Sequence, residues 1–127
     1  MWKLNADRPI YLQIAERMEL SICSGIYQPG EKIPSVRDLA AEAGVNPNTM
    51  QRALAELERR RVIVTFRTNG RTVTEDKEMI KETRNALARE HVHEFLKKMK
   101  EMGFEKEDII QYLQEGELEE EEKKSVG

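Results

Sequence analysis

The chain has 127 residues, a length that suits one domain or a small domain with an appendage. Hydrophobic residues make up 39% of it, enough for a packed core, and no apolar run reaches the ~18 residues of a membrane-spanning helix. The N-terminus lacks the apolar stretch of a signal peptide, and the single Cys23 excludes an intramolecular disulfide. We therefore expect a cytoplasmic protein that does not contact a membrane.

The net charge of −3 disfavours nucleic-acid binding until its distribution along the chain is considered. Residues 1–75 carry 11 Lys and Arg against 9 Asp and Glu, whereas residues 76–127 carry 10 against 15. Six arginines and two glutamates lie within residues 46–71. Because salt screens charges beyond ~10 Å, this local positive segment can bind phosphate although the whole chain is acidic.

The first helix is predicted to begin near Pro9, with Asp7 as its cap and Gly25 after its end. A turn follows at residues 27–30, where Pro and Gly occupy positions that a type II turn prefers. Apolar residues recur every four positions through the helix, which predicts one buried stripe: Ile10, Ile14, Met18 and Ile22.

Two further helices are predicted with only a tight turn between them. The first begins at Ser35, which forms a capping-box pattern with Asp38, and it ends at Gly44. The second begins at Asn46, with Pro47 in its first position. Helices joined by so short a turn cross steeply, which is the helix-turn-helix arrangement. The buried face of the second helix is predicted to be Met50, Ala53, Leu54 and Leu57.

A β-hairpin is predicted after that helix, which runs to about Arg60. Residues 62–66 are a β-branched run and residues 72–74 are a second short strand. Asn69-Gly70 between them is a strong hairpin signal, because a two-residue turn needs positive φ at both positions. A hairpin that follows a helix-turn-helix is a wing. The predicted fold class is therefore mainly α with a small β-hairpin.

From Asp76 the pattern is helical again as far as Met102, and residues 109–113 indicate a last short helix. The predicted organisation is a winged helix-turn-helix domain at residues 1–75, a two-helix dimerisation appendage at 76–116 and an acidic, disordered tail at 117–127. The long helix carries a heptad-like seam that requires a partner: Ala88, Val92, Phe95, Met99 and Met102.

The polar residues at the start of the second and third helices and in the wing suit DNA. The major groove of B-DNA admits one α-helix, where Asn and Gln bind adenine and Arg binds guanine. The wing can enter the adjacent minor groove or bind phosphates. The candidate DNA-binding residues are Ser35, Arg37, Asn46, Asn48, Thr49, Gln51, Arg52, Arg67, Asn69, Gly70 and Arg71.

Several of these features have a structural alternative. Ser35 and Asn46 are also helix caps, and residues 59–61 are arginines at a helix end, where cations suit the helix dipole without touching DNA. Cys23 is expected to be a small buried hydrophobic residue instead of a redox switch. His91 and His93 diverge by ~200° on a helix, so they do not chelate one metal ion within a chain.

The sequence resembles one known family. The resemblance lies in residues 9–14 (PIYLQI), 29–40 (PGEKIPSVRDLA) and 44–57 (GVNPNTMQRALAEL), which are similar to the GntR family of bacterial transcription regulators. Residues 46–49 (NPNT) and the short C-terminal part resemble its small YtrA-type subfamily. The resemblance covers about residues 8–75. It implies a homodimer on a palindromic operator, with DNA contacts from Arg37, the start of the third helix and the wing tip.

Two features depart from the family pattern. Many members have Arg where this chain has Pro47 and Gln51, so their usual guanine contacts do not carry over. The family wing commonly has Gly-x-Gly and then an aromatic residue. Here the wing is Asn69-Gly70-Arg71-Thr72-Val73, in which Arg71 adds a positive charge. The base preference is therefore expected to differ from that of the better-known members.

The main hypothesis is a sequence-specific transcriptional regulator, a repressor that binds double-stranded DNA as a homodimer. No catalytic triad, zinc ligand set or phosphate-binding loop is found, so neither an enzyme nor a cofactor or metal is expected. Two alternatives stay open. A winged helix can bind proteins instead of DNA, in keeping with the negative net charge. A regulator can also sense a small molecule at the seam, where Met99 and Met102 offer an adaptable surface.

Overall fold

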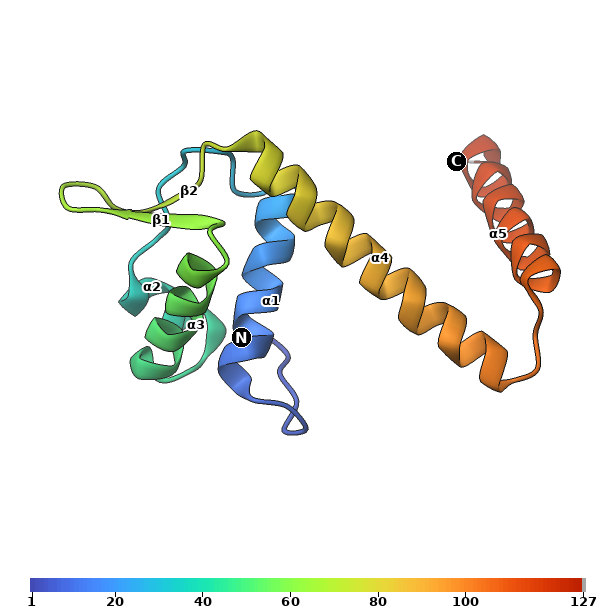
Figure 1. Cartoon of the computed structure of the whole chain (residues 1–127), viewed down its shortest axis with the longest axis horizontal. Helices are drawn as coiled ribbons and strands as arrows, with labels where there is room; N and C mark the ends of the chain where they lie inside the picture. The colour runs from blue at the N-terminus through green and yellow to red at the C-terminus, as the bar shows by residue number, and fades with distance from the viewer. Residues whose placement is uncertain (127) are drawn as a thin grey trace. The chain divides into compact units, whose positions relative to one another are not determined.

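The structure is a computed structural model that describes the backbone of residues 1–126 and the side chains of residues 1–116. In this part of the chain, five helices and two strands follow in the order α1, α2, α3, β1, β2, α4, α5 (Figure 1). The chain forms two compact units, Met1–Ala86 and Leu87–Gly127. The mainly helical fold with one small hairpin confirms the predicted fold class.

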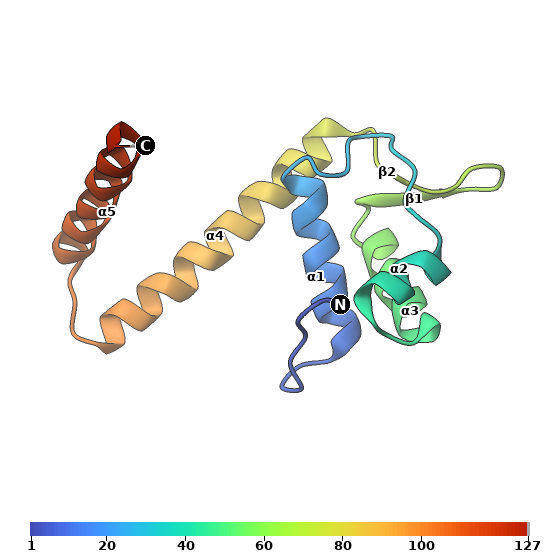
Figure 2. The ribbon, with the colours of Figure 1, turned by 180° about the vertical axis from the view of Figure 1, so that it is seen from behind.

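The first unit consists of three helices, a hairpin and the start of α4, residues 77–86. Both views of the ribbon show α1, α2 and α3 side by side, with the hairpin extending away from them (Figures 1 and 2). The strands are antiparallel, with Ile63 paired to Val73 and Phe66 to Gly70. Lys32 forms an isolated bridge with Thr72, which ties the segment before α2 to the wing. The bounds are α1 Ile10–Cys23, α2 Val36–Ala43, α3 Pro47–Arg59, β1 Ile63–Phe66 and β2 Gly70–Val73.

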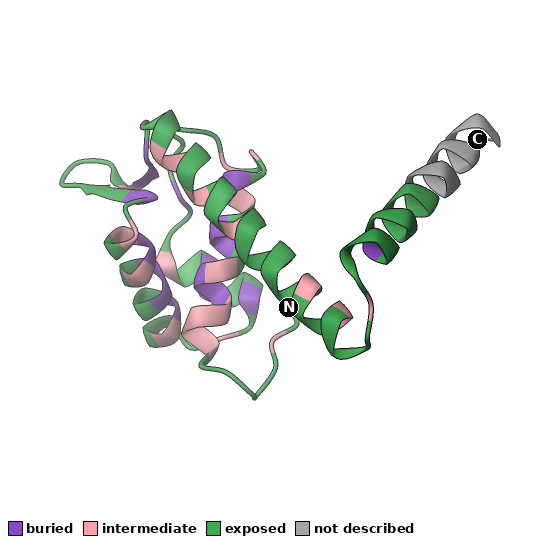
Figure 3. Cartoon of the chain, turned by 45° about the vertical axis from the view of Figure 1, so that its right-hand side comes forward, coloured by how far each residue is buried: buried purple, intermediate pink, exposed green. Residues whose placement is uncertain are grey.

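The core of the first unit lies between α1, α2, α3 and the hairpin. Ile14, Met18 and Ile22 form the buried stripe of α1, with Ile10 half-buried beside them. The predicted buried face of α3 is confirmed at all four positions: Met50, Ala53, Leu54 and Leu57. Figure 3 shows buried residues gathered on the sides of these helices that face one another, whereas α4 (Lys77–Glu101) has no buried residue.

The cap predicted for α1 is wrong. The helix begins at Ile10 with Pro9 at its N-cap position and no side-chain cap. The Asp7 backbone N–H instead donates to Asn5 Oδ1. The side chain of Gln13 ties down this segment, because it accepts from the Asn5 N–H and donates to the carbonyl oxygens of Asn5 and Arg8. A side chain one turn into the helix thus fastens the segment before it, while no side chain caps the first turn.

The turn predicted for the hairpin is also wrong in detail. Three residues, 67–69, separate the paired positions Phe66 and Gly70, and Gly70 has a φ of 70° whereas Asn69 does not have a positive φ. The ladder therefore closes through a three-residue loop instead of a two-residue turn at Asn69-Gly70. Gly70 supplies the left-handed conformation that starts β2.

The second unit contains the end of α4 and α5 (Lys106–Val126). Gly103, with a φ of 90°, follows the end of α4. The rings of Phe104 and Tyr112 meet edge to face, and Ile109 is buried. α5 is longer than the short helix predicted at residues 109–113. The side chains of the predicted tail, residues 117–127, lie outside the described residues, so its disorder stays a prediction.

Candidate nucleic-acid interface

The start of α3 carries the polar side chains predicted to meet base edges. Asn46 caps the helix: its Oδ1 accepts a hydrogen bond from the Asn48 backbone N–H at 2.8 Å, and Pro47 follows in the first helical position. This cap uses the Asn46 carbonyl oxygen and not its NH₂ group, which can still donate. Asn48 and Gln51 are exposed and Thr49 is half-buried. One side of α3 therefore offers donors and acceptors while the other packs in the core.

The start of α2 has a similar construction. Ser35 Oγ accepts a hydrogen bond from the Asp38 backbone N–H at 3.1 Å, which confirms the predicted N-cap. The Ser35 hydroxyl hydrogen is not used by this bond and can donate to a phosphate oxygen. Arg37 lies in the first helical turn and is exposed.

The turn between α2 and α3 is closed by backbone hydrogen bonds. Gly44 adopts a left-handed φ of 74°, and the N–H groups of Gly44 and Val45 both donate to the Ala40 carbonyl oxygen, at 2.9 and 3.0 Å. Val45 is half-buried against the core. Backbone hydrogen bonds and the packed Val45 side chain therefore hold the turn in place. This fixes the direction of α3 relative to α2.

Arg52 has a partner that the sequence did not indicate. Its guanidinium carbon lies 3.9 Å from the centroid of the Tyr11 ring, in cation–π geometry. Tyr11 is in the first turn of α1 and is half-buried, whereas Arg52 is exposed on α3. The pair joins two helices that are 41 residues apart in the chain. The one sequence signal near this pair is that Tyr11 lies within residues 9–14, the first segment that resembles the GntR family.

The wing places its predicted residues in two different settings. Arg67, Asn69 and Gly70 are exposed at the end of the hairpin. Arg71, by contrast, lies in β2, and its Nε donates to Glu58 Oε1 of α3 at 2.6 Å. Arg71 therefore ties the wing to α3, and its charge is partly neutralised there.

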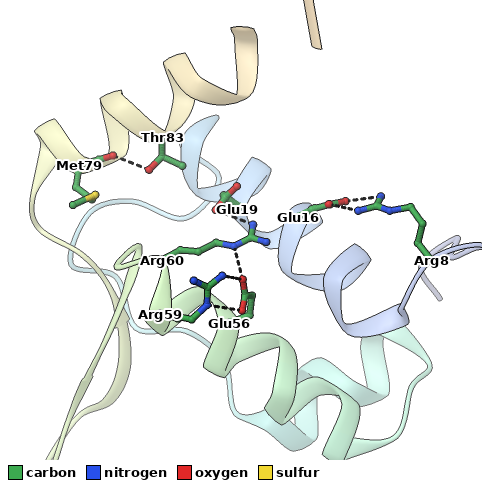
Figure 4. Close-up of polar contacts among 8 residues, drawn as sticks. All are labelled: Arg8, Glu16, Glu19, Glu56, Arg59, Arg60, Met79 and Thr83. Atoms are coloured by element: carbon green, nitrogen blue, oxygen red, sulfur yellow. Dashed lines mark hydrogen bonds and ion pairs between the residues drawn. The ribbon is translucent and has the colours of Figure 1, made fainter. Parts of the chain in front are cut away.

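An ion-pair cluster links the end of α3 to α1 (Figure 4). Glu56 accepts hydrogen bonds from Arg59 and Arg60, and these bonds lower its pKa to about 2, with the bond from Arg59 as the largest cause. Arg60 also reaches Glu19, a buried carboxylate of α1, with 3.3 Å between Nη1 and Oε2. Arg59 and Arg60 thus have carboxylate partners at the helix end, which favours the structural alternative for them. The sequence missed Glu19 because 41 residues separate it from Arg60.

Other groups in the described residues provide no site for a metal ion or a reactive thiol. No set of three His, Cys, Asp or Glu side chains there can hold a metal ion. Cys23 is buried, and burial raises the pKa of its thiol, to which the nearby Glu19 adds. No helix in the described part of the chain is both long and apolar enough to span a bilayer.

A capped, polar recognition helix after a closed turn, followed by a wing with an arginine near its tip, defines a winged helix-turn-helix DNA-binding protein. The chain belongs to the gntR family of bacterial regulatory proteins, whose family model matches residues 10–73. This confirms the resemblance noted in the sequence. The chain is therefore a transcriptional regulator of this family with a DNA-binding domain.

The similarity extends beyond the family domain. The chain is 35% identical over 111 residues to the HTH-type transcriptional repressor YtrA of Bacillus subtilis, covering 87% of this chain and 85% of that protein. A GntR family transcriptional regulator from Listeria monocytogenes shares 39% identity with a TM-score of 0.83, over 88% of this chain and 98% of that one. The DNA-binding domain of AraR in complex with operator ORE1 matches with 25% identity and a TM-score of 0.51, covering 58% of this chain and 93% of that one.

Proposed function

We propose that the protein is a repressor that binds a palindromic operator as a homodimer. The observation that carries the proposal is the start of α3, where exposed Asn48 and Gln51 follow a capped Asn46 on a helix whose opposite side is sealed in the core. Both side chains can form paired hydrogen bonds with adenine in the major groove. Ser35 and Arg37 at the start of α2 are proposed to hold the DNA backbone, since backbone contacts set the register of the recognition helix.

The wing tip is proposed to make a second set of contacts. Arg67, Asn69 and Gly70 are exposed at the end of the hairpin and can lie along the adjacent minor groove or its phosphates. Arg71 is the weakest member of the predicted set, because Glu58 already binds it. We propose that its main contribution is to orient the wing.

The seam on α4 supports the proposed homodimer. Val92 and Phe95 on α4 are 54% and 42% exposed, and Met102 directly after the helix is 64% exposed, so large apolar side chains are left uncovered along the seam. A second copy of the chain would cover them, and a two-fold axis would place two recognition helices one DNA turn or a multiple of it apart. The repressor role is proposed from the similarity to YtrA, which is named a repressor.

Selection of bound DNA from a random pool tests the proposal. We expect an enriched palindrome bound by two chains of 14.8 kDa each. Arg37→Ala and Asn48→Ala should both weaken binding to that palindrome without lowering the melting temperature. An unchanged affinity for both variants at all salt concentrations would exclude the proposed interface. Enrichment of a single half-site bound by one chain would exclude the dimer.

The two alternatives gain no support from the described residues. A hollow of about 580 Å³ lies in the first unit between β1 and the start of α4, and its lining includes Arg61, Thr65, Thr74 and Met79. It is not at the seam, where a small molecule would have to act on a dimer. Sensing at Met99 and Met102 therefore stays a hypothesis that this hollow does not support.

A further inference from the structure

The contact between Tyr11 and Arg52 sets Arg52 apart from the other arginines of α3. Arg59 and Arg60 are bound by Glu56, and Glu56 lies one helical turn from Arg52 on the same stripe. Among the described residues Arg52 forms no ion pair, and its planar group lies on a ring instead. The positive charge of Arg52 is thus not cancelled by a carboxylate, whereas the charges at the end of the helix are.

Stacking determines what Arg52 can donate. A guanidinium group that lies over a ring has one face covered, but its N–H groups point outward in the plane of the group. The ring restricts the Arg52 side chain to few rotamers before DNA binds. Less side-chain entropy is therefore lost on binding. Because Tyr11 belongs to α1, the stack directs the Arg52 guanidinium group towards α1, although Asn48 lies one helical turn before Arg52 on the same face of α3.

We propose that Tyr11 is a positioning residue that holds Arg52 as a phosphate contact at the edge of the groove, so that Arg52 does not read a base. This inference rests on the proposed function, because it requires α3 to enter the major groove. It changes the role predicted for Arg52 from guanine recognition to sequence-independent binding. Discrimination between bases is then left to Asn48 and Gln51.

The test measures affinity for the selected palindrome and for a scrambled duplex over a range of salt concentrations. Arg52→Ala should lower the affinity for both duplexes about tenfold. It should also reduce the slope of log K against log salt by ~0.9 for each half-site, which is the value for one lost phosphate contact. Tyr11→Leu keeps the charge and should weaken both about threefold, in line with an exposed cation–π pair. Tyr11→Phe keeps the ring face and should bind like the wild type.

A matched control is available on α1, the helix that carries Tyr11. Arg17 lies 4.7 Å above the Trp2 ring, so Arg17→Ala removes the same charge from the same kind of pair. It should leave both the affinity and the salt slope unchanged. In a double-mutant cycle, Tyr11→Leu should add nothing to Arg52→Ala. If Tyr11→Leu lowers the melting temperature of the protein, Arg52→Lys is used in its place, because an ammonium group keeps the charge without the planar stack. Arg52→Lys should lower the affinity for both duplexes equally.

Three results would overturn the inference. If Arg52→Ala lowers the affinity for the palindrome but not for the scrambled duplex, Arg52 contacts a base. Tyr11→Phe that binds as poorly as Tyr11→Leu would assign the effect to the hydroxyl group. Variants that all bind like the wild type would show that the pair has no role in DNA binding. The proposed function itself fails if the wild-type protein shows no salt-dependent DNA binding or does not prefer the palindrome to the scrambled duplex, so its failure is distinguishable from that of the inference.

Discussion

The two units of the chain bury their apolar residues to very different degrees. In the first unit, α1, α2, α3 and the hairpin enclose Met50, Leu54, Leu57 and Val73 completely. In the second unit Ile109 is buried, while Phe95, Met102 and Leu113 remain 42% to 64% exposed. The first unit therefore has a core of its own, and the second is expected to complete its core with another chain.

Removing a side chain from the core of the first unit should give the largest effect. Leu54→Ala leaves a cavity at a fully buried position and should lower the free energy of unfolding by about 3 kcal/mol. Urea unfolding followed by circular dichroism measures it. The matched control is Leu20→Ala on α1, where the side chain is 56% exposed and the loss should stay below about 0.5 kcal/mol. Equal losses for the two variants would contradict the position of the core.

A charge on the seam should break the association of the second unit and leave the first unit folded. Phe95→Asp buries an unpaired carboxylate in the proposed interface, so the dimer dissociation constant should rise by about 100-fold or more. Analytical ultracentrifugation measures the mass against 14.8 kDa for one chain. His93→Asp adds the same charge about 200° around the helix and serves as control. A Phe95→Asp protein that stays dimeric would remove the seam from the account.

The end of α3 offers a smaller, stabilising change in the first unit. Arg61 has a left-handed φ of 66°, with its N–H bonded to the Glu58 carbonyl and the Val62 N–H bonded to that of Leu57. This is the helix-ending motif that glycine forms without strain. Arg61→Gly should raise the free energy of unfolding by about 0.5–1 kcal/mol. Thermal unfolding that shows Arg61→Gly to be less stable than the wild type would mean that the Arg61 side chain contributes more than the strain costs.

The smallest effect should be a dependence on acid at the ion-pair cluster. The pKa of Glu56 is lowered from 4.5 to about 2 by Arg59 and Arg60. A carboxylate with a lowered pKa stabilises the folded state above its unfolded pKa and loses this contribution as the pH falls towards the folded value. The difference in melting temperature between the wild type and Glu56→Gln should therefore be constant above about pH 5 and shrink between pH 4.5 and 2. A difference that grows on acidification would contradict the assigned shift.

Local features of the fold and of the candidate site were predictable from the sequence. Ser35 and Asn46 cap their helices as expected because a cap bond spans only two or three residues. The buried face of α3 followed from its period, since one side of a helix meets the core. The gntR resemblance rested on the same local segments.

Contacts between distant segments were not predictable. Glu19 with Arg60, and Tyr11 with Arg52, form only once α1 packs on α3, and neither pair has a pattern along the chain. The hairpin turn was placed one step wrongly because strand register, and not the Asn69-Gly70 dipeptide alone, decides the length of the loop. The start of α1 is a third case, in which the helical Gln13 side chain folds back and bonds to the segment before it.

The stoichiometry and salt dependence of binding to the selected palindrome test the central claim most directly. They test DNA binding by α3 of the first unit and dimerisation through the exposed seam of the second unit in one experiment. The account predicts two chains per palindrome, a steep fall of affinity with salt and a clear preference over a scrambled duplex. One chain per duplex, or equal affinity for both duplexes at every salt concentration, would contradict it.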